Sequence, residues 1–271
     1  MERKFDNRRG YYQKKKNAPV SARPAETEEE NGGELLLEGR HAVREALRAG
    51  RSINRLYYAD GELDGSAREL LTLAREARVV TAAVSRARLD DMSQTHHHQG
   101  FIAVAAPFAY TELSDLIESA GDSGLLVVLD GVSDVHNLGS IIRTAVCAGA
   151  DGLIIPKHRA AAVNAAVVRT SAGAAEYLPV ARVTNLSRAL EVLKEAGYWI
   201  NGAAMDGQSM YDADLRGKTV LVIGSEGEGL SRLVRETCDR VVSIPQTGTI
   251  DSLNASVAAA VLLYEAYRQR R

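Results

Sequence analysis

Residues 125–145 read LLVVLDGVSDVHNLGSIIRTA, and within them one hydrophobic pattern gives way to another. The first five residues are all apolar, which is typical of a strand buried on both faces of a parallel sheet. After the polar turn, apolar residues recur at the spacing of an amphipathic helix. The turn carries the spacing Asn-x-Gly-x-x-x-Arg, over Asn137, Gly139 and Arg143. Ligands of open α/β sheets bind where such strands end, so this turn is the first candidate site.

The same alternation continues to the C-terminus and predicts an α/β domain at 125–271, with a parallel sheet covered by helices on both faces. Strands are expected at 125–132, 152–156, 177–183, 198–205, 219–226 and 240–246, and helices at 138–148, 162–173, 185–196, 228–237 and 254–269. A smaller α/β unit is predicted at 34–107. A linker at 108–124, with a Gly/Asp/Ser cluster near its end, separates the two domains.

The N-terminal tail, residues 1–33, is predicted to be disordered. Its first 16 residues hold seven Lys or Arg against two acids, interleaved with Phe5, Tyr11 and Tyr12. Such a segment either pairs with the phosphates and stacks on the bases of a polyanion, or only keeps the chain in solution. If it binds RNA, removing the tail should weaken a salt-sensitive affinity.

Composition indicates a cytoplasmic globular protein. Hydrophobic residues make up 45% of the 271 residues, yet no apolar run approaches the ~20 residues that a membrane helix needs. Cys147 and Cys238 lie far apart without a companion at ligand spacing, which is typical of a reduced compartment. The three histidines at 96–98 share no face of a helix or strand, so we expect no metal site.

The polar residues of the first turn have a structural and a chemical interpretation. Asn137 either caps the helix or holds Arg143 and a substrate hydroxyl. Gly139 lies four residues before Arg143 and is expected to leave a notch through which a ligand or another chain approaches. In the structural alternative, the motif is a helix cap followed by a solvated arginine.

A second turn lies in residues 220–234, which read VLVIGSEGEGLSRLV. Its spacing resembles a dinucleotide-binding loop, which makes a nicotinamide-dependent (NAD) oxidoreductase a rival hypothesis. Glu226 and Glu228, however, lie where a pyrophosphate needs bare amides, and their charges would repel it. A ligand that carries an ammonium and a sulfonium is not repelled. The loop's glycines, among them Gly224 and Gly229, suggest that a small molecule approaches the backbone closely.

The chain ends in a loop and a helix, at 244–271, and the helix is apolar almost all round. Such a helix is either central to the core or packed against a second subunit. Ser252 and Asn254 are good helix caps, and at the end of a strand they are equally suited to orient a hydroxyl.

These three segments resemble, in residues and in order, the motifs of the SpoU/TrmH ribose methyltransferases of the SPOUT superfamily. The blocks that match are Asn137-Leu-Gly-Ser-Ile-Ile-Arg143, Ile223-Gly-Ser-Glu-Gly-Glu-Gly229, and Ile244-Pro followed by Ser252-Leu-Asn-Ala-Ser-Val257. The resemblance runs from about Leu125 to Arg271. It departs from the family pattern at Gln246-Thr247, where Met-Ala or Met-x is commoner. Residues 157–190 and the front unit, with EGRHAVREAL and HHQGFIAV, resemble the subgroup that acts on a guanosine of large-subunit (23S) rRNA.

The resemblance implies a front domain like ribosomal protein L30e that binds the substrate, and a C-terminal domain with a deep trefoil knot. It also implies S-adenosyl-L-methionine as cofactor, RNA (rRNA in particular) as substrate, and an obligate homodimer that uses the last helix. Carried over by position, the cofactor contacts are Gly224, Gly229, Ile244 and Leu253. The catalytic residues on the acceptor side are Asn137, Arg143, Glu226, Ser252 and Asn254.

The implied reaction transfers a methyl group from a sulfonium to a ribose 2′-oxygen. The family proposal makes the arginine the base, but a guanidinium does not release a proton near neutral pH. We therefore expect Arg143 to stabilise the developing alkoxide and to clamp a neighbouring phosphate. Asn137 and Asn254 are expected to position the hydroxyl and the ribose, and Glu226 to hold the loop or the polar end of the cofactor.

Two more alternatives stay open, a non-catalytic RNA-binding module and an enzyme that modifies tRNA instead of rRNA. The intact Asn137 and Arg143 argue against the first, and the front domain favours rRNA. A basic face for RNA on that domain is predicted from the arginines on or beside one helix, which are Arg40, Arg44, Arg48, Arg51 and Arg55.

Overall fold

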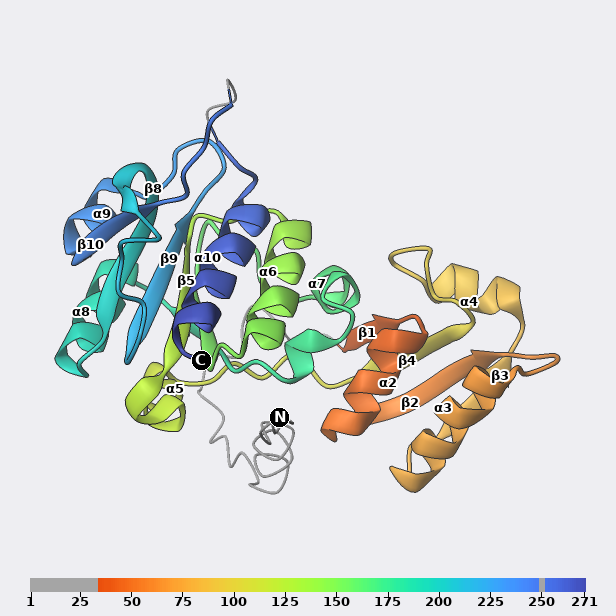
Figure 1. Ribbon diagram of the computed structural model, residues 1–271. Coiled ribbons are helices and arrows are strands. Elements are labelled where there is room, and N and C mark those ends of the chain that lie inside the picture. Colours follow the sequence, from red (N-terminus) through yellow and green to blue (C-terminus); the bar gives the residue numbers. More distant parts are fainter. Residues whose placement is uncertain (1–33, 249–251) are drawn as a thin grey trace, which may run out of the picture.

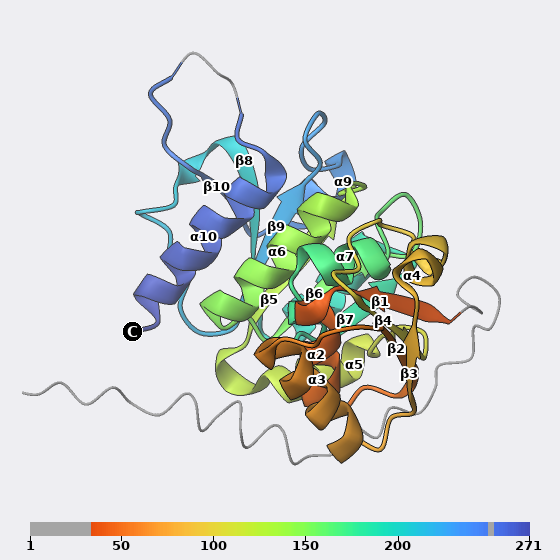
Figure 2. The ribbon, with the colours of Figure 1, turned by 90° about the vertical axis from the view of Figure 1, so that its right-hand side faces the viewer.

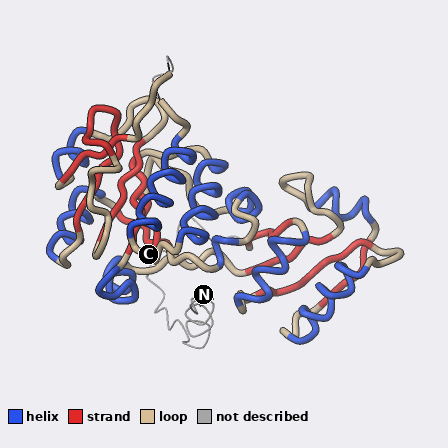
Figure 3. Tube along the Cα trace, in the orientation of Figure 1, coloured by secondary structure: helices blue, strands red, loops and turns tan. Residues whose placement is uncertain are grey.

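The computed structural model describes residues 34–248 and 252–271, so the basic tail at 1–33 lies outside the described residues. The described part contains two sheets, each flanked by helices (Figures 1 and 3). None of its helices has the length and apolar character needed to cross a membrane.

The smaller sheet, in the front domain, has four strands in the order β1-β4-β2-β3. β4 is antiparallel to both of its neighbours, whereas β2 and β3 are parallel. The domain comprises β1 (Leu35–Glu38), α2 (Arg40–Ala49), β2 (Ile53–Ala59), α3 (Gly65–Glu76), β3 (Thr81–Val84), α4 (Arg86–Met92) and β4 (Phe101–Ala105). α2 buries Val43 and Leu47, and α3 buries Leu70, against Leu37 and Leu56 of the strands.

The larger sheet has six parallel strands in the order β10-β8-β9-β5-β6-β7, as the apolar runs predict. These are β5 (Leu125–Asp130), β6 (Gly152–Pro156), β7 (Val180–Val183), β8 (Trp199–Ser209), β9 (Thr219–Gly224) and β10 (Arg240–Ser243). From β5 the strand order runs outward in both directions, toward β6 and toward β9. The loops after β5 and β9 therefore flank a topological switch point, where α/β sheets bind ligands.

Helices cover both faces of this sheet, because successive side chains of a strand point to opposite sides. Leu125, Val127 and Leu129 pack with α6 and α10, whereas Leu126 and Val128 pack with α5, α8 and α9. The helices are α5 (Leu113–Ala120), α6 (Val135–Ala148), α7 (Ala165–Thr170), α8 (Leu186–Glu195), α9 (Arg232–Thr237) and α10 (Ala255–Gln269). α6 and α10 lie side by side in both ribbon views (Figures 1 and 2).

The two domains meet where α2 contacts the segment after α7. The Tyr177 hydroxyl donates a 2.5 Å hydrogen bond to Glu45 on α2. Arg51 forms a 2.6 Å ion pair with Glu176, and both side chains are more than nine-tenths buried. Gly173, at φ 82°, lies so close that a Cβ there would come within 2.6 Å of Glu45 Cβ. These contacts fix the front domain against the larger one.

The trefoil knot that the resemblance implies stays a prediction. The segment on which it depends runs from β10 to α10, and residues 249–251 of that segment lie outside the described part.

Candidate functional site

Three of the five predicted catalytic residues come together at the carboxyl edge of the larger sheet. Asn137 lies on the first turn of α6, Glu226 follows β9, and Asn254 begins α10. Asn137 Nδ2 donates to Glu226 Oε1 at 2.7 Å, and Asn254 Nδ2 donates to Asn137 Oδ1 at 3.0 Å. Asn254 Nδ2 also donates to Glu226 Oε1. Each of the three motifs therefore contributes one residue to a single polar cluster.

The helix that follows fixes which way the Asn254 amide points. Its Oδ1 accepts hydrogen bonds from the backbone N–H groups of Ser256 and Val257, at 2.9 and 3.3 Å, and from the Ser256 hydroxyl at 2.6 Å. Backbone amides only donate, so Oδ1 must face the helix and Nδ2 must face the cluster. Asn254 therefore caps α10 and joins the cluster at the same time, and its role in a reaction stays a prediction.

One interpretation of Asn137 made it the cap of its helix, and the structure shows that it is not the cap. α6 begins three residues earlier than expected, and Asp134 caps it by accepting a 2.8 Å hydrogen bond from the His136 backbone N–H. Asn137 is then the third residue of the helix, with 5% of its surface exposed. Its amide is free of capping, which leaves it available to the cluster.

A cavity of about 190 Å³ lies beside the cluster. Among residues 34–248 and 252–271, two carboxylates line it, Asp134 and Glu226, and no lysine or arginine does. The sequence-based prediction missed Asp134, although an aspartate at the start of a helix beside the motif is a recognisable signal. The described residues that line it are Gly131, Val132, Ser133, Asp134, Asn137, Ser225, Glu226, Gly227 and Ala255.

The loop at 225–229 that carries Glu226 is a closed hairpin. Ser225 and Gly229 exchange two backbone hydrogen bonds of 3.0 and 3.1 Å, and Gly229 has a φ of 67°. Gly224 is needed because the loop folds back on it: a Cβ there would lie 2.2 Å from the carbonyl carbon of Gly229. The glycines were expected to let a small molecule approach the backbone closely. At Gly224, what approaches is the backbone of Gly229 in the same loop.

We expect Gly224→Ala to destabilise the protein by at least about 1–3 kcal/mol, because the added methyl group overlaps backbone atoms that cannot rotate away. Gly227→Ala is the matched control, since a Cβ at Gly227 meets nothing within 4 Å and should change stability by less than about 0.5 kcal/mol. Thermal unfolding of the two variants measures the difference. Equal midpoints would contradict the packing of this loop.

Arg143 does not reach the cluster. It lies six residues beyond Asn137, which places it about 9 Å along the helix axis and on another face. Its side chain is exposed and forms no hydrogen bond or ion pair with any residue of 34–248 or 252–271. The expectation that Gly139 opens a notch beside Arg143 is wrong. A Cβ there would lie 2.7 Å from Thr170 Cβ, so Gly139 is the point where α7 packs against α6.

The remaining predicted residues surround the same edge of the sheet. Gly224 ends β9, in register with Asp130 at the end of β5. Ile244 directly follows β10 and is partly buried, whereas Ser252 and Leu253 are exposed just before α10. Ile244 and Leu253 therefore precede and follow residues 249–251, which are not described.

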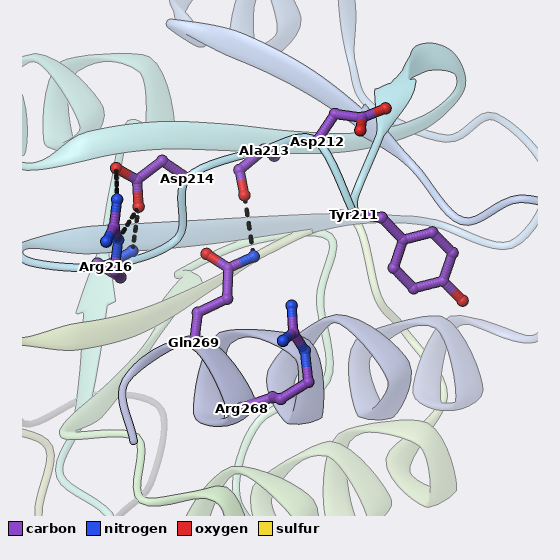
Figure 4. Close-up of a pocket in the computed structure, with 7 residues that line it drawn as sticks. All are labelled: Tyr211, Asp212, Ala213, Asp214, Arg216, Arg268 and Gln269. Atoms are coloured by element: carbon purple, nitrogen blue, oxygen red, sulfur yellow. Dashed lines mark hydrogen bonds and ion pairs between the residues drawn. The ribbon is translucent and has the colours of Figure 1, made fainter.

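A larger depression, of about 320 Å³, lies at the other end of α10 (Figure 4). Several of its polar groups contact one another: Gln269 donates to the Ala213 carbonyl at 2.9 Å, and Arg216 pairs with Asp214 at 2.8 Å. None of the predicted site residues lines it. We therefore interpret it as the attachment of the C-terminal helix to the connection between β8 and β9.

The predicted basic face of the front domain is largely neutralised. Arg40, Arg44 and Arg48 pair with carboxylates of their own domain, and Arg51 pairs with Glu176 of the other domain. Only Arg55 among the five lacks an ion pair within the described residues, and its guanidinium lies over the Tyr57 ring at 5.9 Å. The spacing along the sequence indicates that these arginines lie on or beside one helix, but it does not show which acidic side chains pair with them.

Comparison with known proteins matches both domains. Residues 124–264 match the SpoU rRNA Methylase family, and residues 36–111 match the substrate-binding domain of RNA 2′-O ribose methyltransferases. A protein of Staphylococcus haemolyticus assigned to the TrmH family of tRNA/rRNA methyltransferases is 43% identical over 88% of this chain and 96% of its own length. A tRNA/rRNA methyltransferase of Synechocystis that is named as uncharacterised is 44% identical over 94% of this chain and 68% of its own length.

Solved structures give the same result. The SpoU methyltransferase AviRb of Streptomyces viridochromogenes, in complex with AdoMet, superposes with a TM-score of 0.76 at 33% identity, over 88% of this chain and 91% of that one. An AdoMet-bound rRNA methyltransferase of Sinorhizobium meliloti has a TM-score of 0.75 at 26% identity, over 88% of both chains. Both family profiles, the relatives and the solved structures agree, and the chain therefore belongs to the SpoU/TrmH family of RNA methyltransferases.

Proposed function

We propose that this chain transfers a methyl group from S-adenosyl-L-methionine to a ribose 2′-oxygen of RNA, and that its target is a guanosine of large-subunit (23S) rRNA. The observation that carries the proposal is the cluster of Asn137, Glu226 and Asn254 beside the cavity at the switch point. The front domain supports the ribose as acceptor, because its profile is that of 2′-O ribose methyltransferases. The AdoMet-bound neighbours support the donor.

The residues of the site suit this methyl donor. Asp134 and Glu226 give the cavity a negative lining, which favours a ligand that carries a sulfonium and an ammonium. When bound, S-adenosyl-L-methionine supplies a methyl group activated by the positive sulfur. Gly224, Gly229, Ile244 and Leu253 would hold it, largely through backbone groups.

Hydrogen-bond capacity separates the roles of the three cluster residues. Asn254 uses both Nδ2 hydrogens within the cluster, and its Oδ1 accepts from the start of α10. It therefore acts as a positioning residue. Asn137 keeps one Nδ2 hydrogen and Glu226 keeps its Oε2 without a partner in the described part of the chain. These are the groups that would meet the 2′-hydroxyl, and Oε2 can accept a hydrogen bond from it.

The rival oxidoreductase hypothesis requires bare amides for a pyrophosphate. In this loop the amides of Ser225 and Gly229 are used within the hairpin, and α9 begins only at Arg232. The carboxylate of Glu226 lines the cavity, where it would repel phosphates. S-Adenosyl-L-methionine should therefore bind, and NAD(H) should not.

Radiolabelled methyl transfer to purified rRNA and tRNA, followed by mapping of 2′-O-methyl positions, tests the proposal. We expect label at one guanosine of the large-subunit rRNA. Label on a tRNA ribose would mean that the substrate is tRNA and that ribose 2′-O-methylation is correct. Label on a base would contradict ribose 2′-O-methylation. Binding of NAD(H) without methyl transfer would contradict both.

We propose further that the chain acts in the cytoplasm as a homodimer through α10. One side of this helix is buried on β9 and α6, at Ala259, Leu262 and Leu263. The other side presents Val257 and Tyr264, 47% and 50% exposed, seven residues apart on one stripe. α6 lies beside α10 (Figure 2), and its Arg143 is exposed. A second copy on this surface would bring Arg143 to an acceptor that it does not reach in the single chain.

Val257→Glu is expected to shift the protein from dimer to monomer, because the charge would be buried in the proposed interface without a partner. Leu233→Glu on α9 is the control, since Leu233 is 58% exposed on the opposite face of the sheet. Light scattering coupled to size-exclusion chromatography reports the mass of each variant. A Val257→Glu protein of unchanged mass would place the interface elsewhere.

A further inference from the structure

The loop between β6 and α7 carries three consecutive side chains that can be cationic, Lys157, His158 and Arg159. We refer to residues 157–159 as the basic loop. His158 and Arg159 are exposed, and Lys157 is partly exposed. The three predicted motifs do not include this loop, and neither does the polar cluster.

The basic loop borders the catalytic cavity. It follows β6, which lies directly beside β5 in the parallel sheet, so it leaves the same edge as the cavity. The connection is direct, because the Ala161 backbone N–H donates a 3.0 Å hydrogen bond to the carbonyl of Val132. Val132 is one of the residues that line the cavity.

Hydrogen bonds hold the start of the loop and the chain just beyond it in place. The Lys157 N–H donates to the Val183 carbonyl at 2.8 Å, and Arg182 donates to the Lys157 carbonyl at 3.0 Å. Beyond the loop, the Val163 N–H donates to the Tyr110 hydroxyl oxygen at 3.0 Å. Because the backbone is already ordered at these points, binding through the loop costs little further backbone entropy.

Charge is segregated between the loop and the cavity. Within residues 34–248 and 252–271, the side chains of the basic loop form no ion pair or hydrogen bond with a carboxylate. Arg40 and Arg51 of the front domain, by contrast, are paired. The cavity itself carries Asp134 and Glu226. An anionic ligand at this edge is therefore excluded from the cavity and attracted to the rim beside it.

We propose that the basic loop binds the phosphate backbone of the acceptor RNA next to the methylated nucleotide. The proposal rests on the function proposed above. An RNA strand matches the charge pattern, because its neutral ribose enters a cavity lined by carboxylates while its phosphates stay on the rim. Contacts to phosphate fix the register of a nucleic acid and carry no sequence information. Lys157 and Arg159 are therefore positioning residues, and substrate choice lies elsewhere.

The test is RNA binding by the full chain without cofactor, at several salt concentrations, with a large-subunit rRNA fragment as probe. Lys157→Gln/Arg159→Gln should weaken binding and reduce the slope of log K against log salt by about 1 for each charge removed. Affinity for S-adenosyl-L-methionine should not change, and turnover at saturating RNA should stay within a few-fold. Arg159→Gln alone should show about half of the change in slope.

Arg216→Gln/Lys218→Gln is the matched control, because it removes the same charge just before β9, at the opposite edge of the sheet. It should leave the slope unchanged. If the loop variant keeps the affinity and slope of the parent chain, or if the control changes them equally, the proposal is wrong. An absence of methyl transfer by the parent chain would instead contradict the proposed function, since binding is measured separately.

Discussion

Arg143→Ala is expected to lower methyl transfer about 10²–10³-fold, equivalent to roughly 3–4 kcal/mol, the loss seen when one group that stabilises a developing oxyanion is removed. The fold should not suffer, because the side chain is exposed and makes no hydrogen bond or ion pair within the described residues. Alanine also has the highest helix propensity. Unfolding free energy should therefore change by less than about 0.5 kcal/mol.

Single-turnover assays with saturating cofactor and RNA measure this loss, and calorimetry checks that the cofactor still binds. Arg188→Ala on α8 is the control, because Arg188 is also an exposed helical arginine, 65% accessible, on the opposite face of the sheet. It should turn over normally. Near-normal turnover by Arg143→Ala would show that this arginine takes no part in methyl transfer.

Mixed dimers locate the acceptor on which Arg143 acts. If Arg143 completes the site of the partner subunit, mixing Arg143→Ala with Asn254→Ala protein should restore activity that neither variant has alone. One of the two sites in a mixed dimer then combines an intact Arg143 with an intact cluster. Without restoration, Arg143 would act on the acceptor of its own subunit.

The sequence predicted the parallel sheet because its strands are buried on both faces and are therefore apolar throughout. It did not predict α4, which runs from Arg86 to Met92. That helix has seven residues and buries only Leu89, so it leaves no 3.6-residue period to detect. Its start at the N-cap Ser85 was the one available signal.

The motifs predicted that Asn137, Glu226 and Asn254 lie at one edge of the sheet, but not which residue each of them contacts. Asn137, Glu226 and Asn254 meet because their strands end at one edge of the sheet, which the order of the elements already indicates. That Gly139 contacts Thr170 depends on how α7 packs on α6, and local spacing holds no information about that packing. Which acidic side chains face the arginines of α2 also depends on the tertiary fold. The sequence does not show these acids, and the arginines alone therefore suggested a basic face.

Arg51→Met is expected to destabilise the protein by about 3–5 kcal/mol, because it leaves Glu176 as a buried charge without its partner. The pair joins the front domain to the catalytic domain, with side chains only 8% and 6% exposed. Arg51 also donates a 2.9 Å hydrogen bond to the Ala106 carbonyl. Arg48→Met is the control, since its ion pairs are partly exposed, with the Arg48 side chain 44% accessible, and exposed pairs contribute about 0–1 kcal/mol.

The dependence on pH distinguishes an uncompensated charge from lost packing. Burial raises the pKa of Glu176 above its ordinary value, and Arg51 opposes that increase. Without Arg51 the pKa should rise further. The folded state then holds a proton that the unfolded state has released, so stability falls as pH rises from the ordinary glutamate range through the raised pKa.

The deficit of Arg51→Met in urea unfolding should therefore be larger at pH 8 than at pH 5. Arg51→Met/Glu176→Met should recover much of it at pH 8, and a deficit equal at both pH values would mean that packing, not charge, joins the two domains.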